Sequence, residues 1–231
     1  MTSRIPALIL LFLPQVCGWS WSRDAHGSRI WFTNSGNVSV DGDPSRLQLF
    51  TKGVIVAEVT RNETDEIIAC RFTEVRDAEE RKWLYGKLGR IPKAVTFDEM
   101  TQIIEKCGDS VVSTSYYLPR FTNPVFPGTM WCGPGDAATD YGSLGYFPGP
   151  DACCRNHDLC PIRSLPGEAI TPRGPNRFTL SDCRCDHALR ACLTKNSADG
   201  NSYTASLLKR LVEMSLSYCL AEDGNVVQLG Y

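Results

Sequence analysis

The sequence feature that most limits the fold is the ten-residue stretch 151–160, which contains three cysteines, a histidine and two aspartates. On a helix, Cys153, His157 and Cys160 fall at positions i, i+4 and i+7 and therefore share one face. We predict a helix over 151–160 that cysteines fasten to other segments. Such a helix would hold the imidazole on rigid backbone, as catalytic and metal sites require.

Two later cysteines repeat this spacing. Cys185 and Cys192 are seven residues apart, as are Cys153 and Cys160. When two antiparallel helices face each other, paired positions have a constant sum, and these cysteines meet that condition as Cys153–Cys192 and Cys160–Cys185. Two disulfides with these partners would fix the helices in register. The two disulfides would lie about 10 Å from each other along the helix axis.

The predicted helix pair brings a carboxylate to the histidine. His157 lies between the two predicted disulfides, and Asp186 lies half a turn from the opposite position on the second helix. A carboxylate that orients an imidazole on a fixed frame is typical of general-base catalysis.

A glycine-containing loop is expected to lie against a second face of the first helix. Cys154 and Asp158 share that face, and we expect Cys154 to pair with Cys132. This pairing would bring the loop 131–135 next to Asp158, with glycines at positions 133 and 135 that let main-chain groups turn inward. Carbonyl and carboxylate oxygens together suit a hard cation such as Ca²⁺.

The N-terminus and the cysteine count indicate a secreted, extracellular protein. Arg4 precedes a short apolar run, so residues 1–18 are predicted to be a signal peptide that is removed before Trp19. The run is too short to span a membrane. Removal of Cys17 leaves ten cysteines, the even number that a disulfide framework needs. Two glycosylation sequons, at positions 37 and 62, fit the same compartment.

The distribution of cysteines predicts two modules. Residues 19–120 contain two, Cys70 and Cys107, which we expect to pair, and residues 121–231 contain eight. The first module is predicted to be a small α+β unit and a candidate pro-segment. Its expected strands are 29–33, 47–51, 54–60 and 67–75, and its expected helices are 77–88 and one that follows a capping box at 96–99 and stops at Gly108.

The second module is predicted to be mainly helical. After the helix at 151–160 we expect a loop over 161–179, a helix from 181 to about 195 and a last helix over about 202–219. Cys183 and Cys219 would fasten this last helix. Arg120, between the modules, is a candidate site for a processing protease. The formal net charge of −2 argues against nucleic acid as the main partner.

These residues resemble secreted phospholipase A2. The segment Cys153-Cys154-Arg155-Asn156-His157-Asp158-Leu159-Cys160 matches the family's active-site helix, and Trp131-Cys132-Gly133-Pro134-Gly135 matches its calcium loop in the group III, bee-venom-like form. The resemblance covers roughly residues 124–220. It implies a disulfide-rich phospholipase A2 domain, built on two antiparallel disulfide-linked helices and a calcium loop, after the small α+β module.

The resemblance also implies an activity and a set of site residues. His157 would activate a water that attacks the sn-2 ester of a glycerophospholipid at a phospholipid aggregate or membrane surface. Asp186 would orient His157, and the Gly133 amide would stabilise the oxyanion. Ca²⁺ would be held by the carbonyl oxygens of Trp131, Gly133 and Gly135 and by the carboxylate of Asp158. For the tyrosine that supports the aspartate in that family, Tyr203 and Tyr218 are the candidates.

Three alternatives compete with this interpretation. The Cys and His residues could bind zinc, although adjacent Cys153 and Cys154 point to different faces and the expected compartment is oxidising. His157 could be a buried structural histidine on an inert disulfide frame. The domain could also be a phospholipase-like scaffold that acts as a toxin or receptor-binding module without catalysis.

Overall fold

The fold is that of a computed structural model of the chain. The structure describes residues 30–32, 46–110, 113–114, 125–138, 140–198 and 202–230. The predicted signal peptide, the first sequon and Arg120 lie outside these residues and stay predictions. Among the described residues, no helix is long and apolar enough to cross a membrane.

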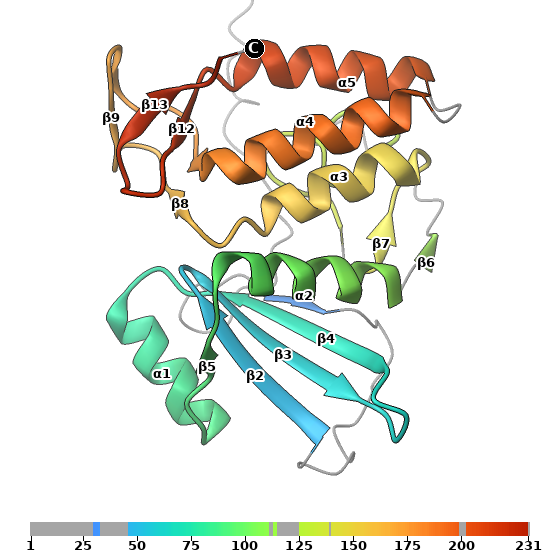
Figure 1. Ribbon diagram of the computed structural model, residues 1–231, viewed down its shortest axis with the longest axis vertical. Helices are drawn as coiled ribbons and strands as arrows, with labels where there is room; N and C mark the ends of the chain where they lie inside the picture. The colour runs from blue at the N-terminus through green and yellow to red at the C-terminus, as the bar shows by residue number, and fades with distance from the viewer. Residues whose placement is uncertain are drawn as a thin grey trace, which may run out of the picture.

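The N-terminal part of the chain forms a five-stranded sheet with strand order β1-β4-β3-β2-β5 (Figure 1). All pairs are antiparallel except β2 and β5. The prediction of strands at 29–33, 47–51, 54–60 and 67–75 is confirmed to within two residues. The strands are β1 (Ile30–Phe32), β2 (Leu47–Lys52), β3 (Ile55–Arg61), β4 (Ile67–Glu74) and β5 (Lys93–Ala94).

One helix covers each face of this sheet. Along β3, Ile55, Ala57 and Val59 point to the face covered by α2 (Phe97–Ser110), whereas Val56 packs with Leu84 of α1 (Ala78–Leu88). This alternation follows from the two-residue repeat of side chains along a strand. The Cys70–Cys107 disulfide, as predicted, ties β4 to α2. The sheet thus fixes the position of α2.

Side chains cap the start of both N-terminal helices, and the capping box predicted at 96–99 is present. Asp77 accepts a hydrogen bond from the Glu80 amide, and Thr96 and Glu99 bond reciprocally to each other's amides as a capping box. The prediction that Gly108 stops α2 is wrong, because the helix continues to Ser110. Gly108 serves close packing instead, since a Cβ atom there would collide with Arg155.

Three further helices stack beyond α2, in the order α3, α4 and α5 (Figure 1). They are α3 (Pro148–Asp158), α4 (Cys183–Ala198) and α5 (Ser202–Ser215). The predicted helix over 151–160 therefore starts three residues earlier and ends two residues earlier than expected. Proline is favoured in the first turn of a helix because it needs no partner for an N–H there.

Short strands occupy several regions where none was expected. The segment 161–179, predicted as a loop, contains one small hairpin at 170–175 and a strand at 163–164 that pairs with residues 180–181 just beyond it, and the chain after α5 returns as another hairpin. Cys219 therefore lies in a strand rather than at the end of the last helix. The short strands are β6 (Ser113–Thr114), β7 (Ser143–Leu144), β8 (Arg163–Ser164), β9 (Ile170–Thr171), β10 (Gly174–Pro175), β11 (Leu180–Ser181), β12 (Tyr218–Leu220) and β13 (Val226–Gln228).

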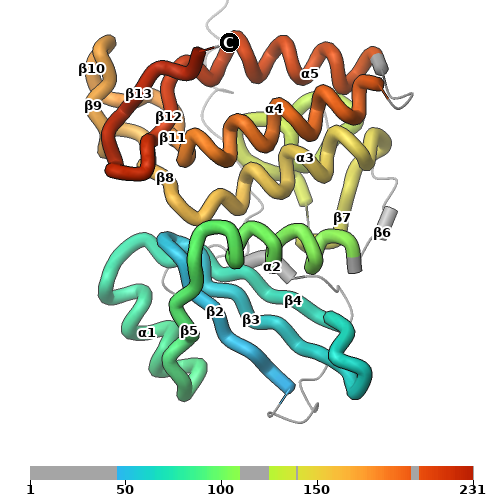
Figure 2. The backbone as a smooth tube through the Cα atoms, viewed as in Figure 1, coloured from blue at the N-terminus to red at the C-terminus, as the bar shows by residue number. Residues whose placement is uncertain are grey.

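A single apolar core runs from the sheet into the helical part of the molecule. It joins Phe72 and Ile104 of the N-terminal part to Trp131, Tyr141 and Leu159 of the C-terminal part. Figure 2 shows the two parts in blue to green and in yellow to red, with α2 between them. The expected boundary at 120/121 stays a prediction, but the described residues on its two sides are packed together.

Candidate active site

The site is built on α3 and α4, which two disulfides join. The predicted pairs Cys153–Cys192 and Cys160–Cys185 are both present, with Cα–Cα distances of 5.7 and 6.0 Å. Cys160 lies two residues beyond the end of α3, so the second disulfide joins the exit of that helix to the first turn of α4. The two helices are therefore fastened on both sides of the histidine.

His157 and Asp186 are in direct contact between these disulfides. The distance from His157 Nε2 to Asp186 Oδ1 is 2.6 Å, and the Asp186 side chain is almost fully buried. A buried carboxylate accepts a hydrogen bond from Nε2–H, and this bond favours the tautomer with an unprotonated Nδ1. His157 is 16 % exposed at its side chain and lines a cavity. The arrangement leaves one basic imidazole nitrogen for chemistry.

The second oxygen of Asp186 is buried and has no hydrogen-bond partner among the described residues. Neither candidate tyrosine fills this position: Tyr203 is 80 % exposed, and no bond joins Tyr218 to the carboxylate. The tyrosine that the resemblance implied is therefore missing from the described part of the site. Asp186 is held by the histidine and by its place in α4.

The loop 131–135 is tied to α3 by two different means. The predicted Cys132–Cys154 disulfide is present, with a Cα–Cα distance of 5.1 Å. Asp151, which is fully buried, accepts hydrogen bonds from the amides of Met130, Trp131 and Gly145 at 2.7–3.0 Å. The sequence analysis missed this role of Asp151, because an aspartate beside a cysteine pair carries no pattern that reveals its partners.

Burial affects the ionisation of Asp151. Desolvation raises the pKa of its carboxyl group, while the three amide bonds and the nearby Arg155 act in the opposite direction. The carboxylate is thus the acceptor around which the loop and the start of α3 are organised.

Some main-chain carbonyls of the loop accept hydrogen bonds and others do not. The oxygens of Met130 and Cys132 accept bonds from Ala137 and Phe126. By contrast, within the described residues, nothing donates to the three carbonyl oxygens that the sequence predicted as calcium ligands, those of Trp131, Gly133 and Gly135. Gly135 has a φ of 108°, a backbone conformation that glycine adopts without strain.

The fourth predicted calcium ligand lies one turn beyond the disulfide to the loop. Asp158 follows Cys154 by four residues on α3, and Arg163 donates to its main-chain carbonyl at 2.7 Å. Carbonyl and carboxylate oxygens are the donor atoms that Ca²⁺ prefers. The residues present therefore fit this cation. Gly133, the predicted oxyanion donor, lies at the exposed part of the loop.

The disulfide pairing excludes a zinc site that uses the cysteines of the stretch 151–160. All three cysteines of the stretch 151–160 are oxidised, and a disulfide sulfur cannot act as a thiolate ligand. Across the part of the chain that the structure describes, no group of three His, Cys, Asp or Glu side chains is placed to hold a metal. His187, the residue that follows Asp186, is exposed.

The cavity beside His157 has a wall that the sequence did not predict. Its volume is about 180 Å³, and α3 and α4 supply two of its sides. The third side comes from α2 of the N-terminal part, which was predicted to be a candidate pro-segment. The residues that α2 contributes are Phe97, Thr101, Ile104 and Glu105.

Comparison with known proteins gives a match over the part of the chain that carries the site. Residues 125–222 match the phospholipase A2 family. The group 3 secretory phospholipase A2 of Bos taurus is 47 % identical over 68 residues, and that of Homo sapiens is 47 % identical over 70 residues. A phospholipase A2 of Bombus pensylvanicus is 42 % identical over 79 residues.

These matches cover only part of each protein. The match to the bovine protein spans 29 % of this chain and 14 % of the bovine protein. The match to the human protein spans 30 % of this chain and 14 % of the human protein. The match to the bumblebee protein spans 34 % of this chain and 57 % of the bumblebee protein. The sheet and α2 lie outside the matched family region. Residues 125–222 are therefore similar to the phospholipase A2 family, and the relatives include group 3 secretory and bumblebee phospholipases A2.

Proposed function

We propose that the protein is a secreted, calcium-dependent phospholipase A2 that hydrolyses the sn-2 ester of glycerophospholipids to a fatty acid and a lysophospholipid. The observation that carries the proposal is the 2.6 Å contact between His157 Nε2 and Asp186 Oδ1 beside a cavity. The phospholipase A2 names of the relatives support the same reaction. The five disulfides support an extracellular location.

In the proposed mechanism His157 is the general base. With Nε2–H donated to Asp186, Nδ1 takes a proton from a water, and the water oxygen attacks the ester carbonyl carbon. The buried carboxylate of Asp186 stabilises the imidazolium that forms. His157 then returns the proton to the leaving alkoxide of the lysophospholipid, so that protons balance and no covalent intermediate with the protein is needed.

The loop supplies the electrophilic half of the site in this proposal. The carbonyl oxygens of Trp131, Gly133 and Gly135 and the carboxylate of Asp158 would hold Ca²⁺. When bound, the ion supplies Lewis-acid stabilisation of negative charge on the substrate. The Gly133 amide donates a hydrogen bond to the developing oxyanion.

A lipid–water interface is the proposed place of action. The hairpin formed by β9 and β10 and the residues after it expose two large apolar side chains, Ile170 and Phe178, at about 70 % each. Arg173 and Arg177 are exposed on the same segment. Apolar groups next to cations suit the boundary between headgroups and acyl chains of a phospholipid aggregate.

The first prediction tests the base. His157→Gln should reduce the release of fatty acid from mixed phosphatidylcholine vesicles by at least about a thousandfold, because the variant has no group to accept the water proton. His187→Gln is the matched control and should leave the rate unchanged, since His187 is exposed. A calcium chelator should stop hydrolysis by the unmodified protein, and added Ca²⁺ should restore it.

Fatty-acid release that persists in His157→Gln would disprove the assignment of the base. Lipid or receptor binding by the unmodified protein without any hydrolysis would instead favour the non-catalytic scaffold.

A further inference from the structure

We propose that α2 is a permanent wall of the substrate cavity, which contacts the acyl chain next to the ester, and that it is not part of a removable cover. This proposal rests on the proposed function for the identity of the substrate. Its structural part, that α2 stays in place and limits access to His157, can be tested without any hydrolysis.

One face of α2 is directed at the catalytic helices. Phe97, Thr101, Ile104 and Glu105 line the cavity, and their spacing of i, i+4, i+7 and i+8 places them on a single helical face. On the same helix, Met100 and Cys107 belong to the buried core that continues into the sheet. The helix is thus shared between the sheet and the cavity.

The lining that α2 supplies is mainly apolar. The hydroxyl group of Thr101 already donates to carbonyls of its own helix, those of Phe97 and Asp98. Thr101 therefore adds apolar surface to the cavity, together with Phe97 and Ile104. Apolar side chains beside a reacting ester suit an acyl chain.

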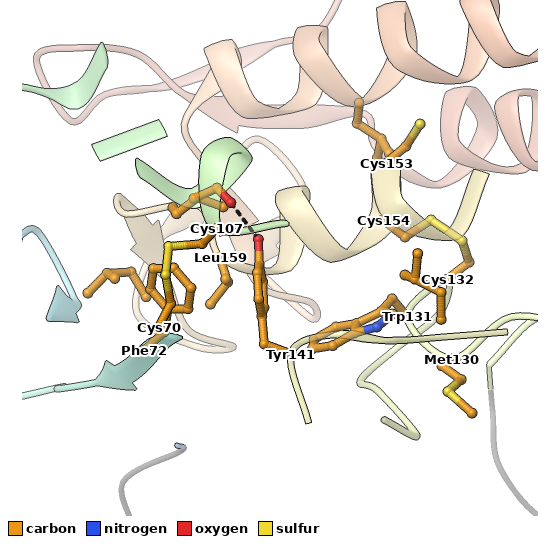
Figure 3. Close-up of a cluster of buried hydrophobic side chains, with 14 of the residues drawn as sticks. Cys70, Phe72, Cys107, Met130, Trp131, Cys132, Tyr141, Cys153, Cys154 and Leu159 are labelled. Atoms are coloured by element: carbon orange, nitrogen blue, oxygen red, sulfur yellow. Dashed lines mark hydrogen bonds between the residues drawn. A yellow bond between two sulfur atoms is a disulfide. The ribbon is translucent and has the colours of Figure 1, made fainter. Parts of the chain in front are cut away.

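Three contacts fasten α2 to the C-terminal part along its whole length. At its start, the guanidinium group of Arg184 stacks on the Phe97 ring at 3.8 Å. In its middle, the Tyr141 hydroxyl group donates to the Ile104 carbonyl at 2.7 Å, a bond drawn in Figure 3. Near its end, Gly108 leaves the space that Arg155 occupies.

The residues that make these contacts are themselves held in place. Tyr141 is fully buried between Phe72 and Trp131, with ring centroids 4.8 and 6.2 Å away (Figure 3). Burial raises the pKa of its hydroxyl group, which keeps it protonated as a donor. Arg155 is buried and lies over the Tyr141 ring at 4.5 Å. Arg184 is paired with Asp182 at 2.8 Å.

These contacts distinguish a wall from a lid. A lid that opens must give up few buried contacts, because local opening is favoured where burial is low. Removal of α2 would expose Met100, Ile104 and the disulfide-bonded Cys107, and would leave the Tyr141 hydroxyl group without its acceptor. The cavity of about 180 Å³ is also smaller than the roughly 300–1,000 Å³ of sites that enclose a whole small molecule, so it suits the reacting segment of a lipid.

The test is the rate at which a bulky aromatic bromoketone alkylates His157, measured by peptide mass spectrometry, with exposed His187 as the internal reference. Thr101→Trp should slow alkylation of His157 relative to His187 by about tenfold or more, because it fills the cavity beside the imidazole. Gln102→Trp is the matched control, since Gln102 is exposed and does not line the cavity. Equal ratios of His157 to His187 alkylation rates in the two variants would contradict the proposal that α2 is a wall of the cavity.

Thr101→Leu provides a smaller change if the tryptophan variant does not fold, and it should slow alkylation in the same direction. In hydrolysis, Thr101→Trp should lose more activity on long-chain than on short-chain diacyl phosphatidylcholine. Slower alkylation together with no hydrolysis by any form of the protein would support the wall and reject the proposed function.

A second measurement tests permanence. A specific protease site introduced between residues 114 and 125 allows the chain to be cut, and no disulfide joins the described residues on its two sides. The two pieces should still elute together under native conditions, with an unchanged ratio of alkylation rates. Separation of the pieces with faster alkylation of His157 would show a removable cover and overturn the proposal.

Discussion

Asp151 shows how much of the site depends on one carboxylate outside the proposed chemistry. Its two oxygens serve three amides, those of Met130, Trp131 and Gly145, and so join the loop to the start of α3. The Cys132–Cys154 disulfide limits the distance between the same two segments, but it does not orient the carbonyls. Asp151 orients the peptide plane that joins Met130 to Trp131, because an amide turns together with the carbonyl of the preceding residue, and this plane directly precedes the predicted ligand carbonyl of Trp131.

Asp151→Asn should therefore loosen the loop while α3 stays folded. An amide side chain offers one oxygen where two are used, so a buried amide donor of the loop loses its acceptor at a cost of about 1–3 kcal/mol in the free energy of unfolding. Calcium affinity, measured by titration calorimetry, should fall as well.

The control is Asp109→Asn, which makes the same chemical change at an exposed position of α2 and should shift stability by no more than about 0.5 kcal/mol. Unchanged calcium affinity in Asp151→Asn would show that the loop does not need this carboxylate.

At the scale of single residues, the sequence predicted the partners that depend on helical spacing. His157 and Asp186 meet as expected, because the cysteine spacing already fixed which helix positions face each other. The role of Asp151 could not be predicted in this way. Its acceptor bonds reach loop residues 20 and 21 positions away, and a loop has no repeat from which a register can be calculated.

At the scale of elements, the helix pair α3–α4 is the part of the fold with the most covalent support. The loop closed by Cys160–Cys185 lies inside the loop closed by Cys153–Cys192. When one of these disulfides is present, the other closes only a short additional loop in the unfolded chain and therefore adds little further stability. Either disulfide alone should hold most of the register between His157 and Asp186.

A double-mutant cycle on these two disulfides should therefore be non-additive. Removal of one by paired Cys→Ser changes should cost less than about 3 kcal/mol in the free energy of unfolding, and removal of both should cost clearly more than the sum of the single losses. Chemical denaturation measures the stabilities, and fatty-acid release should disappear only when both are absent.

The Cys70–Cys107 disulfide gives the control for this cycle. Its two cysteines are 37 positions apart, and the segment between them does not overlap the other two loops, so its removal should be additive with the loss of either. Additivity between Cys153–Cys192 and Cys160–Cys185 would show that the disulfides act independently.

The elements themselves divide into those that a local pattern specifies and those that distant contacts specify. The four longer strands were predicted from runs of β-branched and aromatic residues between turn residues, and the start of α2 was predicted from the capping box at 96–99. Gly108 was wrongly predicted to end α2, because only the presence of Arg155 explains a glycine inside that helix. The hairpin of β12 and β13 was missed although Gly224 marks its turn, since Cys219 was assigned to the last helix.

At the scale of the whole molecule, a buried ion pair crosses between the sheet and the helical part. Glu74, at the end of β4, lies 3.3 Å from Arg163, and both side chains are less than 10 % exposed. The same guanidinium group donates to the carbonyl of Asp158. The sheet therefore braces the end of the helix that carries the predicted ligand carboxylate.

Glu74→Gln should lower the free energy of unfolding by about 3 kcal/mol, because it leaves a buried guanidinium group without its counter-charge. Glu63→Gln is the matched control. It removes a pair with Arg46 at a similar distance of 3.2 Å, but Glu63 is 83 % exposed, so its effect should stay below about 1 kcal/mol.

Unfolding of Glu74→Gln should remain a single transition by circular dichroism and by tryptophan fluorescence, since one core joins the two parts. Two separated transitions would show that the sheet and the helical part unfold independently, and would contradict the role given to this ion pair.

The sequence showed less at this scale than at the other two. Cysteine density divided the chain into two regions, and the spacing of the cysteines, together with those left over, predicted the pairs within each region that the structure shows. It could not show that α2 lies against α3, because an apolar helix face specifies burial and not the surface that buries it. Contacts such as Tyr141 to Ile104 join positions 37 residues apart that no repeat relates.

The separation of the disulfides into two sets has a consequence for biosynthesis. Cys70 and Cys107 are the first of the ten paired cysteines to leave the ribosome and enter an oxidising compartment, and they are bonded to each other. Their early closure would leave eight cysteines with 105 ways to pair. The constant spacing in α3 and α4 then favours one arrangement as soon as both helices form. The order of translation and the geometry of two helices together reduce the number of incorrectly bonded products that an isomerase must correct.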